Sequence, residues 1–266
     1  MDILCHEIKE HVKEAYTKVA NSGAGCGCGP TACGSPAQDW TLSESYSNVD
    51  GYEVDADYAL GCGIPTEHAK IKKGDTVLDL GSGAGNDVFV ARRIVGDSGY
   101  VIGVDITEAM IEKANENKQK LGYDNVDFVL GEIEALPLKN NSIDVSVSNC
   151  VLNLVPDKKK AYQEVYRVLK PGGHFSMSDI VLRGNLPKGI MEAAEMYAGC
   201  ISGALQQDDY MEAIKNAGFK NITITKERIV DMPDDVLLNY VCCPEELEKF
   251  KASDNAVVSL GVYAEK

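Results

Sequence analysis

The chain has 266 residues, of which 44% are hydrophobic and 25% are charged, and its formal net charge at pH 7 is -15. These proportions are typical of a globular protein with a full hydrophobic core. The excess of acidic residues argues against a nucleic-acid partner, because such a surface repels phosphate. We see no secretory leader and no apolar run near the ~18 residues of a membrane span. We therefore expect a cytoplasmic protein with no membrane partner.

The N-terminal region combines a predicted helix with a segment rich in glycine and cysteine. Apolar residues recur at helical spacing over residues 5–19, which predicts an amphipathic helix. Residues 21–36, with the sequence NSGAGCGCGPTACGSP, contain five glycines, two prolines and three cysteines. Such a segment has little to bury and many positions that break regular structure. We expect it to be a mobile loop that carries thiols.

From Gly74 onwards, short apolar strands alternate with amphipathic helices. The predicted strands cover residues 76–80, 100–105, 126–131, 142–149 and 172–180, and the predicted helices between them cover 85–95, 107–121 and 157–169. This alternation predicts an α/β fold with a parallel sheet and helices on both faces. Beyond this core, helices over 188–203 and 207–217 and strands over 221–229 and 256–266 are expected to extend the sheet and cover its ligand edge.

We therefore expect three parts in the chain. Residues 1–69 hold the N-terminal helix and the mobile segment, residues 70–183 form the α/β core, and residues 184–266 form a C-terminal α+β cap. Ligands of an open parallel sheet bind at the carboxyl ends of its strands. We therefore expect the ligand-binding and catalytic residues in the motifs that follow the predicted strands.

The most specific motif is DLGSGAG, residues 79–85, which follows a predicted buried strand and leads into a predicted helix. Its glycines permit a tight turn and close approach of a ligand. The third glycine comes one residue sooner than in the dinucleotide motif GxGxxG, and the carboxylate of Asp79 suits an ammonium group better than a pyrophosphate. Asp105 ends the next strand, where a carboxylate binds the ribose hydroxyls of an adenosine. GEIEALP, residues 131–137, follows the third strand, where an adenine would lie.

These motifs, with LKPGGHFSMSD at residues 169–179, resemble those of the seven-strand S-adenosylmethionine-dependent methyltransferases. The resemblance covers residues 70–183 and implies a Rossmann-like fold that binds S-adenosylmethionine. It implies that Asp79 and the loop of Gly81, Gly83 and Gly85 hold the methionine part. It also implies that Asp105 holds the ribose, that Glu132 and Ile133 flank the adenine, and that Asn149 lies near the sulfonium. Ser82 and Ile106 complete the expected cofactor-binding set.

Cysteines are the notable candidates for the acceptor site, since no general base stands out for an oxygen or nitrogen acceptor. Cys150 directly follows the fourth strand, at the carboxyl edge of the sheet. Cys62 lies in LGCGIP just before the core, and Cys33 lies in the glycine-rich segment. Cys200 lies in YAGCISGAL, within the covering region.

Several thiolates beside a methyl donor suit a soft ion. A zinc site is not indicated, because zinc-binding cysteines usually form C-x-x-C pairs, and the nearest pattern here is Cys26-Gly27-Cys28. Trivalent arsenic is soft, takes three thiolates in a pyramid and keeps a lone pair. That lone pair attacks a methyl group without a general base, so the residues favour arsenic as the methyl acceptor.

The whole chain resembles the bacterial and archaeal arsenite methyltransferases. GCGIP, DLGSGAGND, SNCVLNL, EVYRVLKPGGHF, SDIVL and GCISGAL occur in that family's order, within residues 30–230. The resemblance implies that Cys150 and Cys200 bind trivalent arsenic, with Cys62 as a third thiol and redox partner. It implies that Cys33 is the mobile thiol that pairs with Cys62 during turnover. It further implies arsenite or its thiol conjugates as substrate, and thioredoxin or a small thiol as the reductant of the disulfide.

Two other functions each explain part of the sequence. A methyltransferase that acts on a carbon or oxygen of a small organic molecule explains the core but not the cysteines. A non-enzymatic, thiol-rich binder of soft metals explains the cysteines but not the cofactor motifs. Cys26 and Cys28 lie near Cys33, so the residues alone leave open which of the three is the mobile thiol. The adjacent pair Cys242-Cys243 is expected to be structural or spare.

Overall fold

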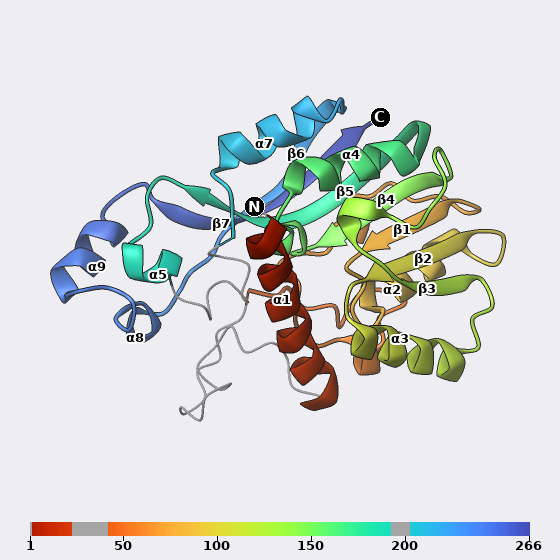
Figure 1. Cartoon of the computed structure of the whole chain (residues 1–266), viewed down its shortest axis with the longest axis horizontal. Coiled ribbons are helices and arrows are strands. Elements are labelled where there is room, and N and C mark those ends of the chain that lie inside the picture. The colour runs from red at the N-terminus through yellow and green to blue at the C-terminus, as the bar shows by residue number, and fades with distance from the viewer. Residues whose placement is uncertain (1, 23–41, 193–202) are drawn as a thin grey trace.

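The computed structural model describes residues 2–22, 42–192 and 203–266, and a seven-stranded sheet lies at its centre (Figure 1). The strand order is β3-β2-β1-β4-β5-β7-β6. In chain order the strands are β1 (Thr76–Leu80), β2 (Tyr100–Asp105), β3 (Val126–Leu130), β4 (Ile143–Asn149), β5 (Leu169–Arg183), β6 (Lys220–Ile229) and β7 (Ala256–Glu265). The described α-helices are α1 (Asp2–Ser22), α2 (Asn86–Val95), α3 (Glu108–Leu121), α4 (Lys158–Val168), α5 (Lys188–Glu192), α7 (Gln207–Asn216), α8 (Asp234–Leu237) and α9 (Pro244–Lys251).

The first five strands pair in parallel, which confirms the α/β architecture predicted from the alternation of elements. The central strands are short apolar runs, because both faces of the sheet are covered. Side chains of α4 and α7 pack in the apolar cluster on one face, and those of α2 pack in the cluster on the other. α3 lies against β2 and β3 on the side of α2 (Figure 1).

The last two strands extend the same sheet in the antiparallel direction. β7 inserts between β5 and β6, and pairs with both. Residues 256–264 of β7 are all buried, since the strand has a neighbour on each side. The outer strand β6 is mostly exposed or half-buried. The predicted extension of the sheet by the C-terminal strands is therefore confirmed.

Two predicted boundaries differ from the structure around residue 170. The predicted helix 157–169 ends at Val168, and β5 begins at Leu169 rather than at 172. Pro171 explains the early start, because proline cannot continue a helix and holds the preceding residue extended. β5 also runs on to Arg183, where it still pairs with β7.

The C-terminal helices were only partly predicted. α5 begins at the predicted residue 188, and the rest of the predicted helix 188–203 lies mostly outside the described residues. α8 and α9 were not predicted. The signals for α9 were present, since Pro244 lies at its first position and Glu245 and Glu246 lie in its first turn, both of which favour a helix start.

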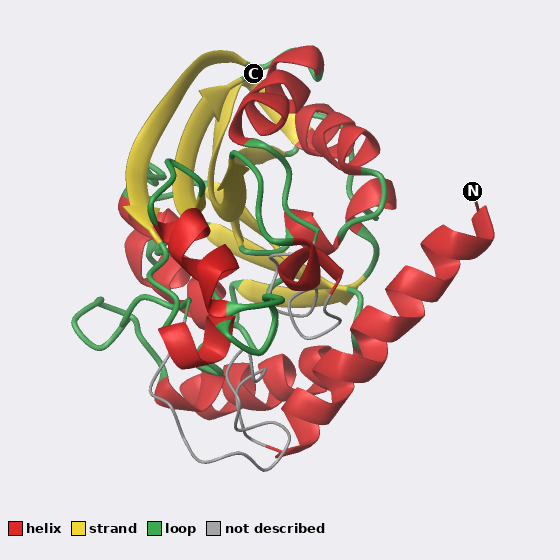
Figure 2. Ribbon diagram, turned by 90° about the vertical axis from the view of Figure 1, so that its left-hand side faces the viewer, coloured by secondary structure: helices red, strands yellow, loops and turns green. Residues whose placement is uncertain are grey.

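α1 is longer than the predicted 5–19 and lies along one side of the molecule (Figure 2). Near its C-terminal end, Val19 and Ala20 pack against Met110 of α3. α5, α8 and α9 gather at the opposite end of the molecule from α3 (Figure 1). Among the described residues, no helix is long and apolar enough to cross a membrane.

Candidate active site

A pocket opens where β1, β2 and β4 end, between the sheet and α1. Strand order reverses about β1, and such a reversal creates the ligand crevice of an open parallel sheet. The pocket is lined by nine of the residues predicted from the sequence, namely Asp79, Gly81, Ser82, Gly83, Asp105, Ile106, Ile133, Asn149 and Cys150. α1 adds Lys9, Val12 and Tyr16 to the lining.

The glycine loop between β1 and α2 combines a ligand-facing and a packing glycine. Gly83 has a φ of +51°, and a Cβ built on it would meet nothing within 4 Å, so the loop leaves open space at this point. Gly85 has a φ of +103°, and its Cβ would lie 2.8 Å from the rings of Phe89 and Phe128. Gly85 does not line the pocket. Its absent side chain lets α2 start close to the sheet.

Backbone N–H groups hold the carboxylate of Asp105 in place. Gly83 N donates to Oδ2 at 2.9 Å, and Thr107 N donates to Oδ1 at 2.8 Å. Burial raises the pKa of Asp105, and these N–H groups act in the opposite direction. Thr107 is the N-cap of α3, although its side chain makes no capping hydrogen bond. The carboxylate is therefore fixed in direction before any ligand arrives.

The carboxyl groups of Asp79, Asp87 and Asp105 lie close enough in this part of the pocket to affect one another's ionisation. Burial raises the pKa of Asp79 well above its ordinary value, with further contributions from Asp87 and Asp105. Burial likewise raises the pKa of Asp87 to about 6. Asp79 Oδ2 is buried and has no hydrogen-bond partner among the described residues. A ligand with a positive charge would satisfy these groups.

Lys9 is the one cationic side chain among the described residues that line the pocket. Its Nζ lies 2.8 Å from Glu132 and 3.1 Å from Glu134. It therefore ties α1 to the segment after β3. Glu132, predicted to flank the adenine, is half-exposed in this ion pair and does not line the pocket, whereas Glu134 does.

The Asn149 side chain joins the glycine-loop side of the pocket to the segment before β1. Its Oδ1 accepts from the backbone N–H of Cys62 at 2.9 Å. Its Nδ2 donates to Tyr46 Oη at 2.8 Å and to Asp87 Oδ2 at 3.2 Å. Tyr46 Oη in turn donates to Asp87 at 2.9 Å. A change at Asn149 would disturb both sides of the pocket.

Cys150 and Cys62 lie on the other side of Asn149. Cys150 directly follows β4, is 3% exposed and lines the pocket. Its φ of +61° is in the left-handed region, which non-glycine residues rarely adopt and which is more common at functional sites. Cys62 is fully buried and does not line the pocket itself. Both cysteines belong to one apolar cluster with Leu42 and Leu154.

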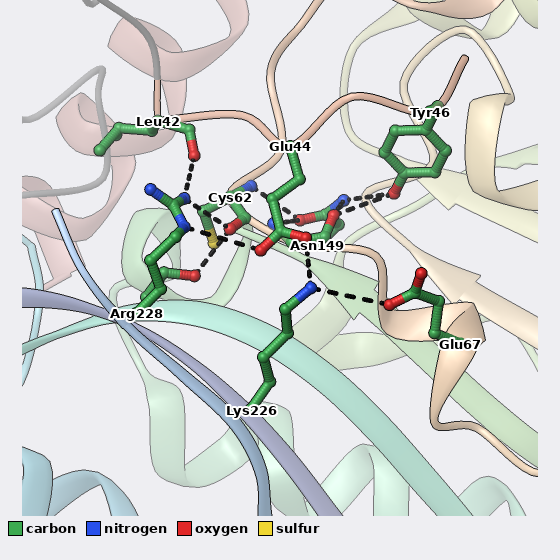
Figure 3. Close-up of polar contacts among 10 residues, drawn as sticks. Leu42, Glu44, Tyr46, Cys62, Glu67, Asn149, Lys226 and Arg228 are labelled. Atoms are coloured by element: carbon green, nitrogen blue, oxygen red, sulfur yellow. Dashed lines mark hydrogen bonds and ion pairs between the residues drawn. The ribbon is translucent and has the colours of Figure 1, made fainter. Parts of the chain in front are cut away.

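A second polar network holds the segment of Cys62 onto β6 (Figure 3). Arg228 Nη2 donates to the carbonyls of Leu42 and Cys62 at 2.6 and 3.3 Å. Lys226 Nζ lies 2.5 Å from Glu44 and 3.7 Å from Glu67. The contact of Lys226 with Glu44 joins residues 182 positions apart in the sequence. The outer strand thus supports the backbone that positions the Cys62 thiol.

The remaining predicted cysteines cannot be placed. Cys33 and Cys200, together with Cys26 and Cys28, lie outside the described residues. The structure therefore brings Cys150 into the pocket and Cys62 into the adjoining apolar cluster.

Sequence reasoning missed Tyr46, Asp87 and the role of α1. Asp87 had a visible signal, because it is an acidic residue in the first turn of the helix that opens from the glycine loop. Tyr46 had none, since it lies in a loop and meets Asp87 only in the folded chain. Likewise, the amphipathic pattern of α1 does not show that its Lys9 reaches residues after β3.

Comparison with known proteins adds independent information. A family model described as a methyltransferase domain matches residues 71–218. The arsenite methyltransferase of Halobacterium salinarum is 41% identical over 231 residues, which are 82% of this chain and 59% of that protein. The arsenite methyltransferase of Homo sapiens is 36% identical over 225 residues, which are 80% of this chain and 58% of that protein.

A solved structure agrees with these relatives. The arsenic(III) S-adenosylmethionine methyltransferase from Chlamydomonas reinhardtii superposes with a TM-score of 0.65 at 34% sequence identity, covering 77% of this chain and 67% of that one. The chain spans about three fifths of the length of the curated relatives described above.

Proposed function

The chain belongs to the arsenite methyltransferase family, and from that premise we propose that it transfers the methyl group of S-adenosylmethionine to trivalent arsenic bound by cysteine thiolates. The observation that carries the proposal is the position of Cys150. This thiol lies in the same pocket as the carboxyl groups of Asp79, Asp87 and Asp105. A soft ligand for the acceptor therefore adjoins a site that suits a cationic donor.

The donor half of the pocket fits S-adenosylmethionine. The α-ammonium group suits the buried carboxyls of Asp79 and Asp87, and the ribose hydroxyls suit the fixed carboxylate of Asp105. The open space at Gly83 leaves room beside the loop. When bound, S-adenosylmethionine supplies an electrophilic methyl group on a cationic sulfur. The role of the chain is to orient this group and to exclude water.

The acceptor half supplies soft ligands. We propose that Cys150, Cys62 and Cys200 bind arsenic as three thiolates, which leaves its lone pair free to attack the methyl carbon. Asn149 orients two of these residues, because it lies next to Cys150 in sequence and holds the backbone of Cys62. The apolar side chains around Cys62 and Cys150 keep water from the arsenic. No general base is required.

The proposal includes a redox step. Methylation converts trivalent arsenic to the pentavalent state, and two thiols return it by giving up two electrons and forming one disulfide. We assign these thiols to Cys62 and Cys33, and propose thioredoxin or a small thiol as the reductant of that disulfide. A cytoplasmic location is part of the proposal, since reducing conditions keep such thiols available.

We further propose that the chain is divided into three parts. Residues 70–183 would form the core of the S-adenosylmethionine site, residues 1–69 would add side chains to both halves of the pocket, and residues 184–266 would support the acceptor half. Three contacts support this division. Lys9 and Tyr46 reach the donor half of the pocket from the N-terminal part, and Arg228 supports Cys62 from the C-terminal part.

The direct test is product analysis with methyl-labelled S-adenosylmethionine and either arsenite or methylarsenite. We expect labelled methylarsenicals from both. Cys62→Ser should lose the reaction with arsenite and keep much of that with methylarsenite, because methylarsenite already carries one carbon ligand and needs only two protein thiols. A Cys62→Ser variant that methylates arsenite at the wild-type rate would show that the three-thiol scheme is wrong.

Separate binding measurements discriminate the alternatives. A methyltransferase for small organic molecules would bind S-adenosylmethionine and show no specific affinity for arsenite. A thiol-rich metal binder would bind arsenite and not S-adenosylmethionine. The proposed function requires both affinities in one chain.

A further inference from the structure

The cysteines of the proposed active site leave one thiol pair unexplained. Cys242 and Cys243 lie between α8 and α9, at the end of the molecule away from α3 (Figure 1). Cys242 is exposed and Cys243 is half-buried. Neither lines the pocket. The expectation that they are spare or structural thiols does not account for how they are arranged.

The two thiols are held side by side. Their Sγ atoms lie 3.3 Å apart. One ion bonded to both sulfurs at about 2.3 Å, the usual length of a metal–thiolate bond, would span this gap with a bond angle near a right angle. A three-coordinate pyramidal ion has an angle of this kind. The wider angle of a tetrahedral ion would need a larger separation.

The local backbone keeps the pair in this arrangement. Cys243 is the N-cap of α9 and has an extended backbone, with φ of −165° and ψ of 160°. Pro244 follows it and restricts the preceding residue to such extended conformations. On the other side, Cys242 N donates to Glu246 Oε2 at 2.7 Å. A ligand would therefore meet two thiols that are already oriented.

A disulfide between the two is disfavoured by geometry. Neighbouring Cα atoms lie about 3.8 Å apart across a trans peptide, whereas a disulfide usually requires at least about 4.4 Å.

The thiols are also hydrogen-bonded to acceptors. The pKa of Cys242 is raised to about 11, chiefly by its hydrogen bond with Cys243 and then by Glu246. The pKa of Glu245 is lowered by its own backbone N–H and then by the Cys243 thiol.

The donor set selects the kind of ion. Among the described residues, no group of three or more His, Cys, Asp or Glu side chains could hold a metal. A tetrahedral zinc ion would therefore find too few protein ligands here. A three-coordinate ion that brings one substituent of its own needs only two thiols.

We propose that Cys242 and Cys243 form a second, surface site that binds a monosubstituted trivalent arsenical. The reaction is RAs(OH)₂ + 2 Cys–SH → RAs(S–Cys)₂ + 2 H₂O, where R is an alkyl, aryl or hydroxyl group. Two As–O and two S–H bonds break, two As–S bonds form, the protons leave in water, and arsenic stays trivalent. The choice of arsenic as the ligand rests on the proposed function.

The position of the pair connects this site to the acceptor half of the pocket. Leu237 of α8 and Leu247 of α9 belong to the apolar cluster that contains Cys62 and Cys150, and Tyr240 packs against it. The two helices that flank the surface thiols thus bury apolar side chains in the same cluster that contains Cys62 and Cys150. One continuous apolar cluster therefore connects the surface pair to the proposed acceptor site.

The sequence allows the pair to be tested in the full wild-type chain. Trypsin cuts after Arg228 and Lys249, and the peptide 229–249 contains Cys242 and Cys243 and no other cysteine. The folded protein is incubated with phenylarsine oxide in the presence of excess glutathione, alkylated with N-ethylmaleimide and digested. We expect the rate at which N-ethylmaleimide alkylates this peptide to fall by at least about tenfold, equivalent to ~1.4 kcal/mol of binding. Addition of a small dithiol, which removes the arsenical, should restore the alkylation rate.

Matched variants separate chelation from a single As–S bond. Cys242→Ser leaves Cys243 as the single thiol of the peptide, and the arsenical should no longer protect Cys243 from alkylation. Glu248→Gln, an exposed change on α9 that keeps both thiols, should leave the protection from alkylation unchanged. Equal alkylation of the wild-type peptide with and without the arsenical would overturn the site, even if the chain methylates arsenic. Protection of the peptide in a chain that produces no methylarsenical would overturn the proposed function and leave the dithiol site standing.

Discussion

The two halves of the pocket are made of chemically different groups. Around the glycine loop, Asp79, Asp87 and Asp105 place carboxyl groups where little water reaches them. Beyond β4, Cys62 and Cys150 lie among apolar side chains. The first half favours a cation and the second favours a soft ion. Because the two halves consist of different side chains, with Asn149 bonded to residues of both, most substitutions should affect either donor binding or acceptor chemistry, and seldom both.

The largest effect is expected at Cys150. Cys150→Ser replaces a soft ligand by a hard, weakly acidic hydroxyl, so methylation of both arsenite and methylarsenite should fall below detection. Affinity for S-adenosylmethionine, measured by calorimetry, should stay within about twofold of wild type, well below the ~1.4 kcal/mol of a tenfold change. A Cys150→Ser enzyme with substantial activity would remove this residue from the arsenic site. A large loss of donor affinity would show that the halves are not independent.

The converse substitution is Asp105→Ala. It leaves the ribose hydroxyls and the N–H groups of Gly83 and Thr107 without their acceptor. Affinity for S-adenosylmethionine should fall by about 1–3 kcal/mol, while arsenite binding should be retained. Asp124→Ala, an exposed change after α3, serves as the control. Unchanged donor affinity in a folded Asp105→Ala protein would contradict the assignment.

Donor binding should depend on pH in a way that arsenite binding does not. The pKa of Asp87 is about 6 in the folded chain against about 3.9 for an unperturbed Asp. Between these values the folded state binds more protons than the unfolded state, so stability without ligand should fall as pH rises from about 4 to about 6. A cation binds the ionised form, so affinity for S-adenosylmethionine should rise over the same interval.

Titration calorimetry from pH 5 to pH 8 in buffers of different ionisation enthalpy checks this dependence. Proton release on binding should be measurable near pH 6 and smaller in Asp87→Asn. A wild-type affinity that is flat with pH, without proton release, would show that the carboxyls are already ionised without the donor.

The smallest effect is expected at Arg228, which acts on the acceptor half through the backbone of Cys62. Arg228→Lys removes the guanidinium Nη2 that donates to the carbonyls of both Leu42 and Cys62, and the compact ammonium of lysine does not reproduce the position of that nitrogen. The rate with arsenite should fall several-fold, and the rate with methylarsenite should fall less. Donor affinity should not change. Lys220→Arg, an exposed change on the same strand, is the control. If Arg228→Lys lowers the rate equally with arsenite and with methylarsenite, the cause is a general loss of stability instead.

The donor half was the more predictable from the sequence. DLGSGAG and Asp105 occupy the ends of two adjacent strands, and once the order of elements is known the fold brings them together. The α/β alternation was visible because buried parallel strands and amphipathic helices have different apolar periods. Asp87 was a near neighbour of these motifs, and its position in the first turn of α2 follows from them.

The contacts that join the halves could not be predicted in the same way. Tyr46 reaches Asp87, and Arg228 reaches Leu42, through side chains that are distant in sequence and lie on irregular or outer segments. No periodic pattern marks such residues. The exposed pair Cys242-Cys243 was visible in the sequence, but only the 3.3 Å separation of its sulfurs suggests a use.

The central claim is that one pocket brings a cationic methyl donor to an arsenic atom held on Cys150. It is tested most directly by a single turnover, with wild-type chain, methyl-labelled S-adenosylmethionine and arsenite in equal amounts and without added reductant. The label should appear on arsenic as S-adenosylmethionine disappears, and Cys150→Ser should show neither change. S-adenosylmethionine that stays intact while both ligands are bound, or a label found only on the protein, would contradict the account.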